Sequence, residues 1–253
     1  MRVVLDVSYD GSRYHGWQKQ PNPRIATVQD ELNKALCNIL NIESINTVCA
    51  GRTDRGVHAV SQIVHFDTEI IRDISAYTKG LNSYLPPDIS IKNAKFVDDN
   101  FHARFSAKSR TYRYFIYSSP NKEAQLNNKM TWVYYDLNID AMQNGAQYLI
   151  GEHDFSSFRG PHCQSLTPVR EVFSISINKD THYLLPDVNV FYIEITANAF
   201  LHNMVRNIVG VLLHVGKGAK DPNWVKDVLN ARNRSAAVNT AKPDGLYLYN
   251  ILY

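Results

Sequence analysis

Two consecutive segments, residues 172–178 and 188–197, follow an apolar–polar period of two. This period is typical of β-strands that place one face on a core and the other in water. Neighbouring strands of this kind favour antiparallel pairing in a sheet with one covered face. The chain must therefore build a sheet and cover one side of it. Further strands are predicted at residues 3–9, 89–96, 111–117 and 246–252.

Amphipathic helical patterns are interspersed with these strands. Residues 27–40 place apolar side chains on one helical face, and Thr27 with Asp30 forms a box-like helix start. Because helices and strands are interspersed, the fold class is α+β or α/β. Other helices are predicted at residues 73–85, 138–150, 200–215 and 221–229.

Composition limits the class of protein. The chain has 253 residues, of which 44% are hydrophobic and 20% charged, as in an ordinary soluble globular protein with one large domain or two modest ones. No apolar run approaches the length of a membrane span, and a charge comes too early for a signal peptide. The three cysteines form no paired framework, which indicates a reducing compartment and hence the cytoplasm.

The order of the predicted elements gives a hint of two halves, each with a leading loop, a helix and several strands. A seam near residues 100–120 would separate them, and we place the boundary between residues 105 and 106. No low-complexity linker is present, so we expect the halves to share one continuous sheet rather than to be tethered independently.

One short segment concentrates the candidate chemistry. Asp54 lies between Arg52 and Arg55, and Gly51 and Gly56 bracket the group. Apolar runs precede and follow the segment, which predicts a loop carried by two strands. A carboxylate beside cations stays ionised easily, which suits a nucleophile or an anchored base, and nearby arginines attract phosphate. The alternative is a turn with a structural salt bridge.

Residues 102–113 combine positive charge with aromatic rings and contain no acid. Cations for phosphates and flat rings for bases are what recognition of single-stranded or looped RNA needs. The net charge is only +3, so the distribution of charge is more informative than its sum. The alternative is a strand with a solvated basic face. The cations are Arg104, Lys108, Arg110 and Arg113.

Arg206 lies within the apolar pattern of residues 200–215. An arginine among apolar neighbours is not fully buried without an anion, and Asp54 is the candidate anion. His202 lies four residues earlier and is expected on the same helical face. The alternative is that Arg206 reaches the surface along its own aliphatic stem.

The ordered motifs resemble the tRNA pseudouridine synthase A family, also called the TruA family. Each fragment alone is weak, whereas their succession over nearly the whole chain is specific. The matching fragments are Tyr9-Asp10-Gly11, Gly16-Trp17-Gln18, Thr27-Val28-Gln29, Ala50 to Asp54, Gly56 to Ala59, Leu81-Asn82, Phe101 to Ala107, Arg110 with Tyr112 and Tyr114, Asp154 to Phe158, Phe200 to Arg206 and Gly245-Leu246.

The resemblance implies an α+β chain with the pseudouridine synthase fold. Two related α/β halves would share an extended mixed, mainly antiparallel sheet with a central cleft. Residues 1–105 would carry the catalytic Asp loop, and residues 106–253 the Tyr112 strand and the Arg206 helix. The implied activity is isomerisation of uridine to pseudouridine in the anticodon stem-loop of tRNAs, at positions 38, 39 and 40. The implied enzyme is a cytoplasmic homodimer that binds no membrane and needs neither cofactor nor metal.

The resemblance also implies a role for four side chains. Asp54 matches the catalytic aspartate and would be the nucleophile, and Arg206 would pair with it. Tyr112 would pack against the target base, and Arg52 would help evert the nucleotide and hold the RNA. Two departures from the family pattern, Arg55 and the polar segment at Lys242, affect local RNA contacts.

Two other classes of protein compete with this interpretation. One is a metal-dependent hydrolase or nuclease that uses Asp54, His58, His65 and Asp67, although their spacing matches no standard metal site. The other is a non-catalytic RNA-binding protein that uses only the basic aromatic segment.

Overall fold

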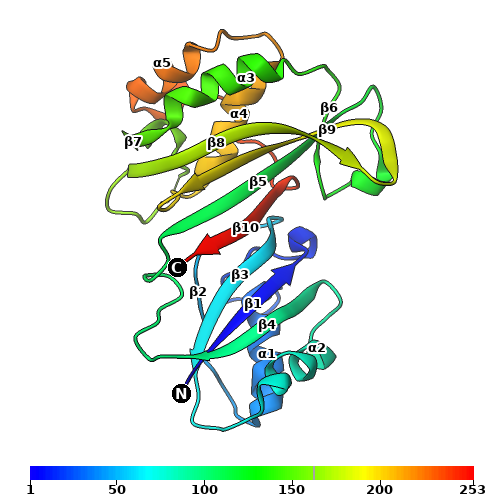
Figure 1. Ribbon diagram of the computed structural model, residues 1–253, viewed down its shortest axis with the longest axis vertical. Helices are drawn as coiled ribbons and strands as arrows, with labels where there is room; N and C mark the ends of the chain where they lie inside the picture. The colour runs from blue at the N-terminus through cyan, green and yellow to red at the C-terminus, as the bar shows by residue number, and fades with distance from the viewer. Residues whose placement is uncertain (162) are drawn as a thin grey trace. The chain divides into compact units, whose positions relative to one another are not determined.

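The computed structural model describes residues 1–161 and 163–253, and it divides them into two compact units (Figure 1). Unit 1 contains residues 1–108 and 247–253, and unit 2 contains residues 109–246. The division at residue 108 lies close to the expected seam. The last strand differs from the expectation, because it belongs to unit 1 and not to the second half.

The sheet of unit 1 has the strand order β4–β1–β3–β10, with β2 beside β3. Strand β1 is antiparallel to both β3 and β4, whereas β10 runs parallel to β3. The parallel pairing of Tyr247 with His58 and of Leu248 with Ala59 explains why the last strand joins unit 1. The strands are β1 (Arg2–Tyr9), β2 (Val48–Cys49), β3 (His58–Asp67), β4 (Ile89–Val97) and β10 (Leu246–Leu252).

Helix α1 (Val28–Leu40) begins where the sequence predicts. The Thr27 hydroxyl donates to the Asp30 carboxylate at 2.7 Å and accepts from the Asp30 backbone N–H at 3.3 Å, so the cap is satisfied in both directions. Val28, Leu32 and Leu36 are fully buried on the predicted apolar face. Figure 1 shows α1 beside α2 against the sheet of unit 1.

The helix predicted at residues 73–85 is two shorter pieces. A 3₁₀ turn, η2 (Ile74–Tyr77), precedes α2 (Lys79–Tyr84), and the two are separated at Thr78. Leu85 is already extended because the following residue, Pro86, disfavours a helical conformation before it. Single 3₁₀ turns also occur at Gly11–Arg13, Ala124–Leu126, Gln147–Leu149, Ser156–Phe158 and Arg234–Ala236.

The sheet of unit 2 has the strand order β5–β9–β8–β7, all antiparallel, with β6 parallel to β5. The two alternating segments that open the sequence analysis pair as expected, and Ile175 lies opposite Ile195 with both side chains buried. The strands are β5 (Ser109–Ser118), β6 (Thr131–Val133), β7 (Gly151–Asp154), β8 (Val169–His182) and β9 (Leu185–Ala197).

Helices α3 (Ile139–Ala146), α4 (Met204–Gly216) and α5 (Trp224–Ala231) lie together on one side of this sheet (Figure 1). None of the helices in the described part of the chain combines the length and apolarity that crossing a membrane requires. Antiparallel strands with helices collected on one side make the class α+β, which confirms that prediction.

Helix α4 starts later than predicted. Asn203 has a left-handed backbone with φ of 59°, so Met204 is the first helical residue. The carbonyl of His202 accepts the N–H of Gly160 at 2.7 Å, and His202 lies in a turn before the helix. The prediction that His202 and Arg206 share a helical face is therefore wrong.

We predict that acid weakens unit 1 through His65. This ring is 4% exposed, and burial lowers its pKa from 6.5 to about 4, with Arg2 and His102 acting in the same direction. The unfolded chain thus binds the proton more readily than the folded chain. The neutral His65 ring therefore makes its full contribution to the stability of unit 1 above pH 6.5, and this contribution is lost as pH falls towards 4. The free energy of unfolding should drop by about 2–3 kcal/mol across this window, as measured by urea denaturation.

The matched variant is His65→Asn. The Nδ1 atom of His65 accepts the N–H of Ala103 at 3.1 Å, and an asparagine oxygen can accept the same bond without titrating. The variant should show a flatter pH dependence. An NMR titration that finds the His65 pKa at 6 or above would contradict the argument.

Candidate active site

The loop that carries Asp54 spans residues 50–57 between β2 and β3. The first end of the loop is tied to β3, because the Ala50 N–H donates to the Ile63 carbonyl at 2.8 Å and the Gln62 amide donates to the Gly51 carbonyl at 2.5 Å. Gln62 is fully buried, which makes it a fixed support and not a surface contact. The predicted loop between two strands is confirmed.

The middle of this loop docks on the opening segment of the chain, residues 9–18. The Trp17 N–H donates to the Thr53 carbonyl at 3.0 Å, and the Gly56 N–H donates to the Tyr14 carbonyl at 3.2 Å. These bonds hold the residues on both sides of Asp54. The backbone of the candidate nucleophile is therefore fixed by a segment far away in sequence.

Side chains support the same docking. The hydroxyls of Tyr9 and Thr53 are 2.7 Å apart, and both side chains are buried. The Gly11 N–H donates to Nδ1 of His58, the first residue of β3, at 3.1 Å. The ring of His58 stacks on Tyr247 of β10 with centroids 4.5 Å apart, so the last strand of unit 1 also supports the loop.

Two glycines allow the opening segment to approach this closely. Gly16 has φ of +90°, and a Cβ there would lie 2.5 Å from the Thr53 carbonyl oxygen. A Cβ at Gly11 would overlap the Val57 carbonyl. Any larger side chain at either position must push the Asp54 loop away.

Asp54 is half-buried, whereas Arg52 and Arg55 are exposed. The carbonyl of Asp54 accepts the N–H of Val57 at 3.1 Å, which closes a turn around Arg55. A half-buried carboxylate on a rigid turn is accessible to a ligand, and the turn also fixes the orientation of the carboxylate. The exposed guanidinium groups on either side suit contact with a polyanion.

Tyr112 lies in β5 opposite Ile195 of β9 and is 9% exposed. Its ring meets the ring of Phe200 edge to face, with centroids 5.0 Å apart. The strand and the phenylalanine together define the orientation of the tyrosine ring.

Arg206 lies in the first turn of α4 and is half-buried. Its Nε donates to the Ala241 carbonyl at 2.8 Å, and its Nη1 donates to the Asn203 side chain at 3.0 Å. The next carbonyl, of Lys242, accepts the hydroxyl of Tyr114 at 2.8 Å. The guanidinium group is thus anchored within unit 2 rather than extended to the surface.

The same anchor brings Arg206 to the face of β5 that carries Tyr112. Tyr112 and Tyr114 are two residues apart in a strand and therefore share a face. Because Tyr114 and Arg206 bind successive carbonyls of one segment, they lie on the same side of β5. Tyr112 and Arg206, the two predicted site residues of unit 2, therefore lie on the same side of β5.

Asn207 stabilises that segment and was not singled out from the sequence. It is fully buried, its amide donates to the Phe158 carbonyl at 2.7 Å, and its oxygen accepts the Thr240 hydroxyl at 2.6 Å. A second donor is Arg234 at 3.1 Å. An asparagine in an otherwise apolar helix is the signal that could have found it, since buried amides need partners.

The basic segment divides its charges between two tasks. Arg110 is 9% exposed and donates to the Asn198 carbonyl at 2.8 Å, and Arg113 pairs with Glu194 across the sheet at 2.6 Å. Arg104 and Lys108, which belong to unit 1, are exposed. Arg110 and Arg113 thus bind groups of unit 2, whereas the exposed pair of cations lies in unit 1.

The alternative of a metal-dependent hydrolase finds little support in the same unit. His65 already accepts a backbone N–H, and Asp67 forms a two-point pair with Arg2 at 2.8 Å. The Arg2 guanidinium lowers the pKa of Asp67. Over residues 1–161 and 163–253, no group of three or more His, Cys, Asp or Glu side chains is arranged to hold a metal ion.

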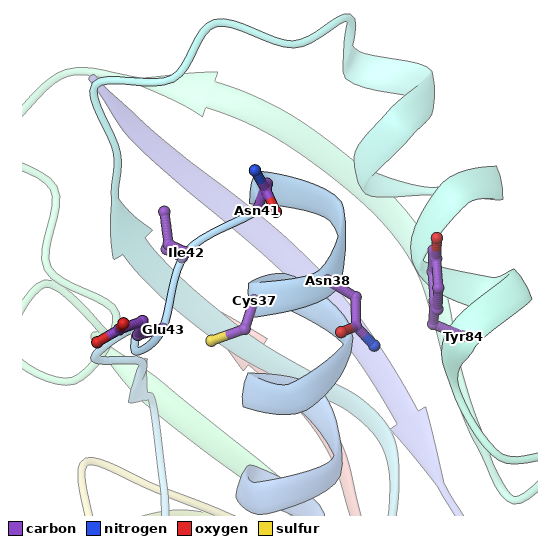
Figure 2. A pocket seen from close by; sticks show the side chains of 6 residues that line it. All are labelled: Cys37, Asn38, Asn41, Ile42, Glu43 and Tyr84. Carbon is purple, nitrogen blue, oxygen red and sulfur yellow. The ribbon is translucent and has the colours of Figure 1, made fainter.

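A hollow of about 480 Å³ lies at the C-terminal end of α1 (Figure 2). The hollow is lined by Cys37 and Asn38 of α1, by Asn41 at the C-terminus of this helix, and by Tyr84 of α2. The opening segment 9–18 docks at the N-terminus of α1, where the Gln29 N–H donates to the Trp17 carbonyl at 3.0 Å. A helix of 13 residues spans about 20 Å, so this hollow is separate from the Asp54 loop.

We predict that Gly16→Ala loosens the Asp54 loop. The new Cβ would be strained by the positive φ and would meet the Thr53 carbonyl, so unit 1 should lose at least about 2 kcal/mol of stability in urea denaturation. The control is Gly80→Ala within α2, where the Cβ would face the terminal methyl of Ile39 at 3.1 Å. That variant should be neutral or stabilising by up to about 1 kcal/mol. Equal effects of the two substitutions would contradict the close-approach argument.

Comparison with known proteins is consistent with this arrangement. The family model described as tRNA pseudouridine synthase matches residues 7–106 and 146–253. A protein of Janthinobacterium sp. (strain Marseille) named tRNA pseudouridine synthase A is 47% identical over 258 residues, which cover 100% of this chain and 92% of the relative.

Two further relatives bear the same name. The proteins of Colwellia psychrerythraea and Legionella pneumophila (strain Lens) are each 47% identical over 253 residues, covering 100% of this chain and 94% and 93% of the relatives. Identity at this level over the full length, together with the family match, confirms the predicted resemblance and the predicted class of enzyme. The chain belongs to the tRNA pseudouridine synthase family.

Proposed function

We propose that this chain isomerises uridine to pseudouridine in the anticodon stem-loop of tRNAs, at positions 38, 39 and 40, with Asp54 as the nucleophile. The observation that carries the proposal is the Asp54 loop itself. Its carboxylate is half-buried on a turn whose backbone is bound on both sides, and exposed arginines flank it. A fixed carboxylate beside cations suits covalent or electrostatic catalysis on a polyanionic substrate.

The reaction breaks one bond and makes another in the same nucleoside. The N-glycosidic bond from N1 of uracil to the ribose is cleaved with the help of the Asp54 carboxylate. The base then rotates and rejoins the ribose through C5, while the proton of C5 leaves and N1 gains one. Product and substrate are isomers, so the balance of atoms and electrons needs no redox cofactor.

Tyr112 and Arg206 supply the other half of the proposed chemistry. The Tyr112 ring, oriented by Phe200, would stack on the detached uracil and keep it in place while it turns. The Arg206 guanidinium, anchored on Ala241 and Asn203, would pair with the Asp54 carboxylate when substrate is bound. Both residues belong to unit 2, and Asp54 belongs to unit 1.

Arg52 would act before the chemistry. A uridine within a stacked arm must be everted at a cost of roughly a few kcal/mol, and a guanidinium group beside the vacated space offsets part of it. Arg52 is exposed on the Asp54 loop and can reach the RNA. The proposal also includes the cytoplasmic location and the homodimer that the family resemblance implies.

The first test is Asp54→Asn. Without the ionised carboxylate the variant should form no pseudouridine, while tRNA binding should stay within about threefold of wild type because the shape of the side chain is retained. Position-resolved chemical mapping of pseudouridine in tRNA from cells that lack the gene, with wild type or variant restored, measures the product. Restoration of isomerisation by the variant would refute the nucleophile.

The matched control is Asp99→Asn. Asp99 is an exposed aspartate of the same unit, outside the Asp54 loop. This variant should restore pseudouridine fully. Product at positions other than 38, 39 and 40 in the wild-type strain would refute the proposed target but leave the reaction standing.

The second test is Arg206→Leu. Loss of the guanidinium group should lower kcat by about 10²-fold or more with a smaller change in KM, since the charge would act on the carboxylate and not on substrate binding. Steady-state kinetics on an unmodified tRNA transcript measure both constants. The control is Arg232→Leu, because Arg232 is 71% exposed in the same unit and should leave kcat unchanged. Normal turnover by Arg206→Leu would remove its assigned role.

A further inference from the structure

The ring of Phe105 is 75% exposed and lies in the part of unit 1 that connects β4 to β5. A single exposed apolar side chain is ordinary on a protein surface. Phe105 differs because three kinds of contact fix its position. Its ring packs on other rings, hydrogen bonds hold its loop, and a cation lies beside it.

A column of rings supports Phe105 from the core. Its ring stacks on His102 with centroids 4.3 Å apart and planes 28° from parallel. His102 in turn meets His65 edge to face at 4.8 Å, and His65 is buried in β3. The exposed ring therefore stands on a support that begins in the sheet.

Hydrogen bonds close the loop around the same histidine. The backbone N–H groups of Arg104 and Phe105 both donate to Nδ1 of His102 at 3.2 Å. The Ser106 N–H donates to the His102 carbonyl, and the His102 N–H donates to the Ser106 hydroxyl, each at 2.9 Å. Four hydrogen bonds within residues 102–106 leave the loop little conformational freedom. The loop therefore holds the Phe105 ring in a fixed position at the surface.

A positive charge lies beside the ring. The guanidinium carbon of Arg104 lies 5.5 Å from the centroid of Phe105, and Arg104 is itself exposed. Burial raises the pKa of the Cys49 thiol to about 12, and Arg52 and Arg104 both act against that rise. Both guanidinium groups thus act on the thiol of Cys49, the residue directly before the Asp54 loop. His65, at the base of the column of rings, pairs with Val48 of β2, the strand that leads into this loop.

We propose that Phe105 is a stacking platform for an unpaired base of the substrate RNA, with Arg104 on the adjacent phosphate. The proposal rests on the proposed function and adds a binding subsite to it. A rigid exposed ring beside cations matches the way proteins hold single-stranded bases. A protein interface would place an apolar cluster at its centre, whereas the neighbours of Phe105 in the loop are arginine and serine.

The test is equilibrium binding of an unmodified tRNA transcript, followed by fluorescence anisotropy, with Asp54→Asn as the parent so that no turnover occurs. Added Phe105→Ala should raise Kd about tenfold, within roughly 5- to 150-fold, because one stacked base is lost. Added Phe105→Trp should bind as well as the parent or better. Arg104→Gln should lower the salt dependence of binding by about one phosphate contact.

The control is Tyr84→Ala in the same parent. Tyr84 is an exposed aromatic residue of unit 1, 56% exposed, and it lies at the hollow of Figure 2. This variant should leave Kd unchanged. Thermal unfolding of Phe105→Ala should match the parent, since the ring is mostly in water already.

The outcomes separate the two proposals. If the parent binds no tRNA, the proposed function is refuted, and the stacking platform that rests on it is refuted as well. If the parent binds and Phe105→Ala binds equally well, the stacking platform is refuted while the proposed function stands. A third outcome would refute the stacking platform in favour of contact with a second copy of the chain. In that case sedimentation would show that Phe105→Ala breaks a dimer, and Phe105→Trp would not restore RNA binding.

Discussion

The docking of residues 9–18 on the loop of residues 50–57 is the contact on which the candidate chemistry depends. It consists mostly of backbone hydrogen bonds, from Trp17 to Thr53 and from Gly56 to Tyr14. Backbone groups cannot change rotamer, so the position of Asp54 follows from the path of the chain and not from the adjustment of a side chain. The glycines at positions 11 and 16 matter because this contact needs the two backbones to touch.

Unit 2 orients its candidate residues by a different device. The guanidinium of Arg206 and the hydroxyl of Tyr114 bind successive carbonyls of residues 241 and 242, and buried Asn207 holds the same segment from below. Polar groups that satisfy one another in a dry environment specify a single arrangement. The arginine is therefore pre-positioned against a segment that has no regular secondary structure.

Local physical rules predicted most of the elements. The α1 helix begins directly after Thr27 because Thr27 and Asp30 form its cap, and the alternating segments 172–178 and 188–197 pair because one face must be covered. The start of α4 was predicted too early, because the left-handed Asn203 and the bond from Gly160 to His202 depend on a distant loop. Asp54 was found from its motif, whereas the support from Thr53 and Tyr9 is a long-range contact that no spacing reveals.

The position of β10 has a consequence for how the chain acquires its structure. Because residues 247–253 complete unit 1, the whole of unit 2 is inserted between two parts of the other unit. A ribosome makes residues 1–108 before unit 2, whereas β10, the parallel partner of β3, is made after unit 2. The ring of Tyr247 that supports His58 is absent until then. Unit 2 can fold as a continuous segment during synthesis, while the sheet of unit 1 that carries the Asp54 loop is completed only after unit 2 has been made.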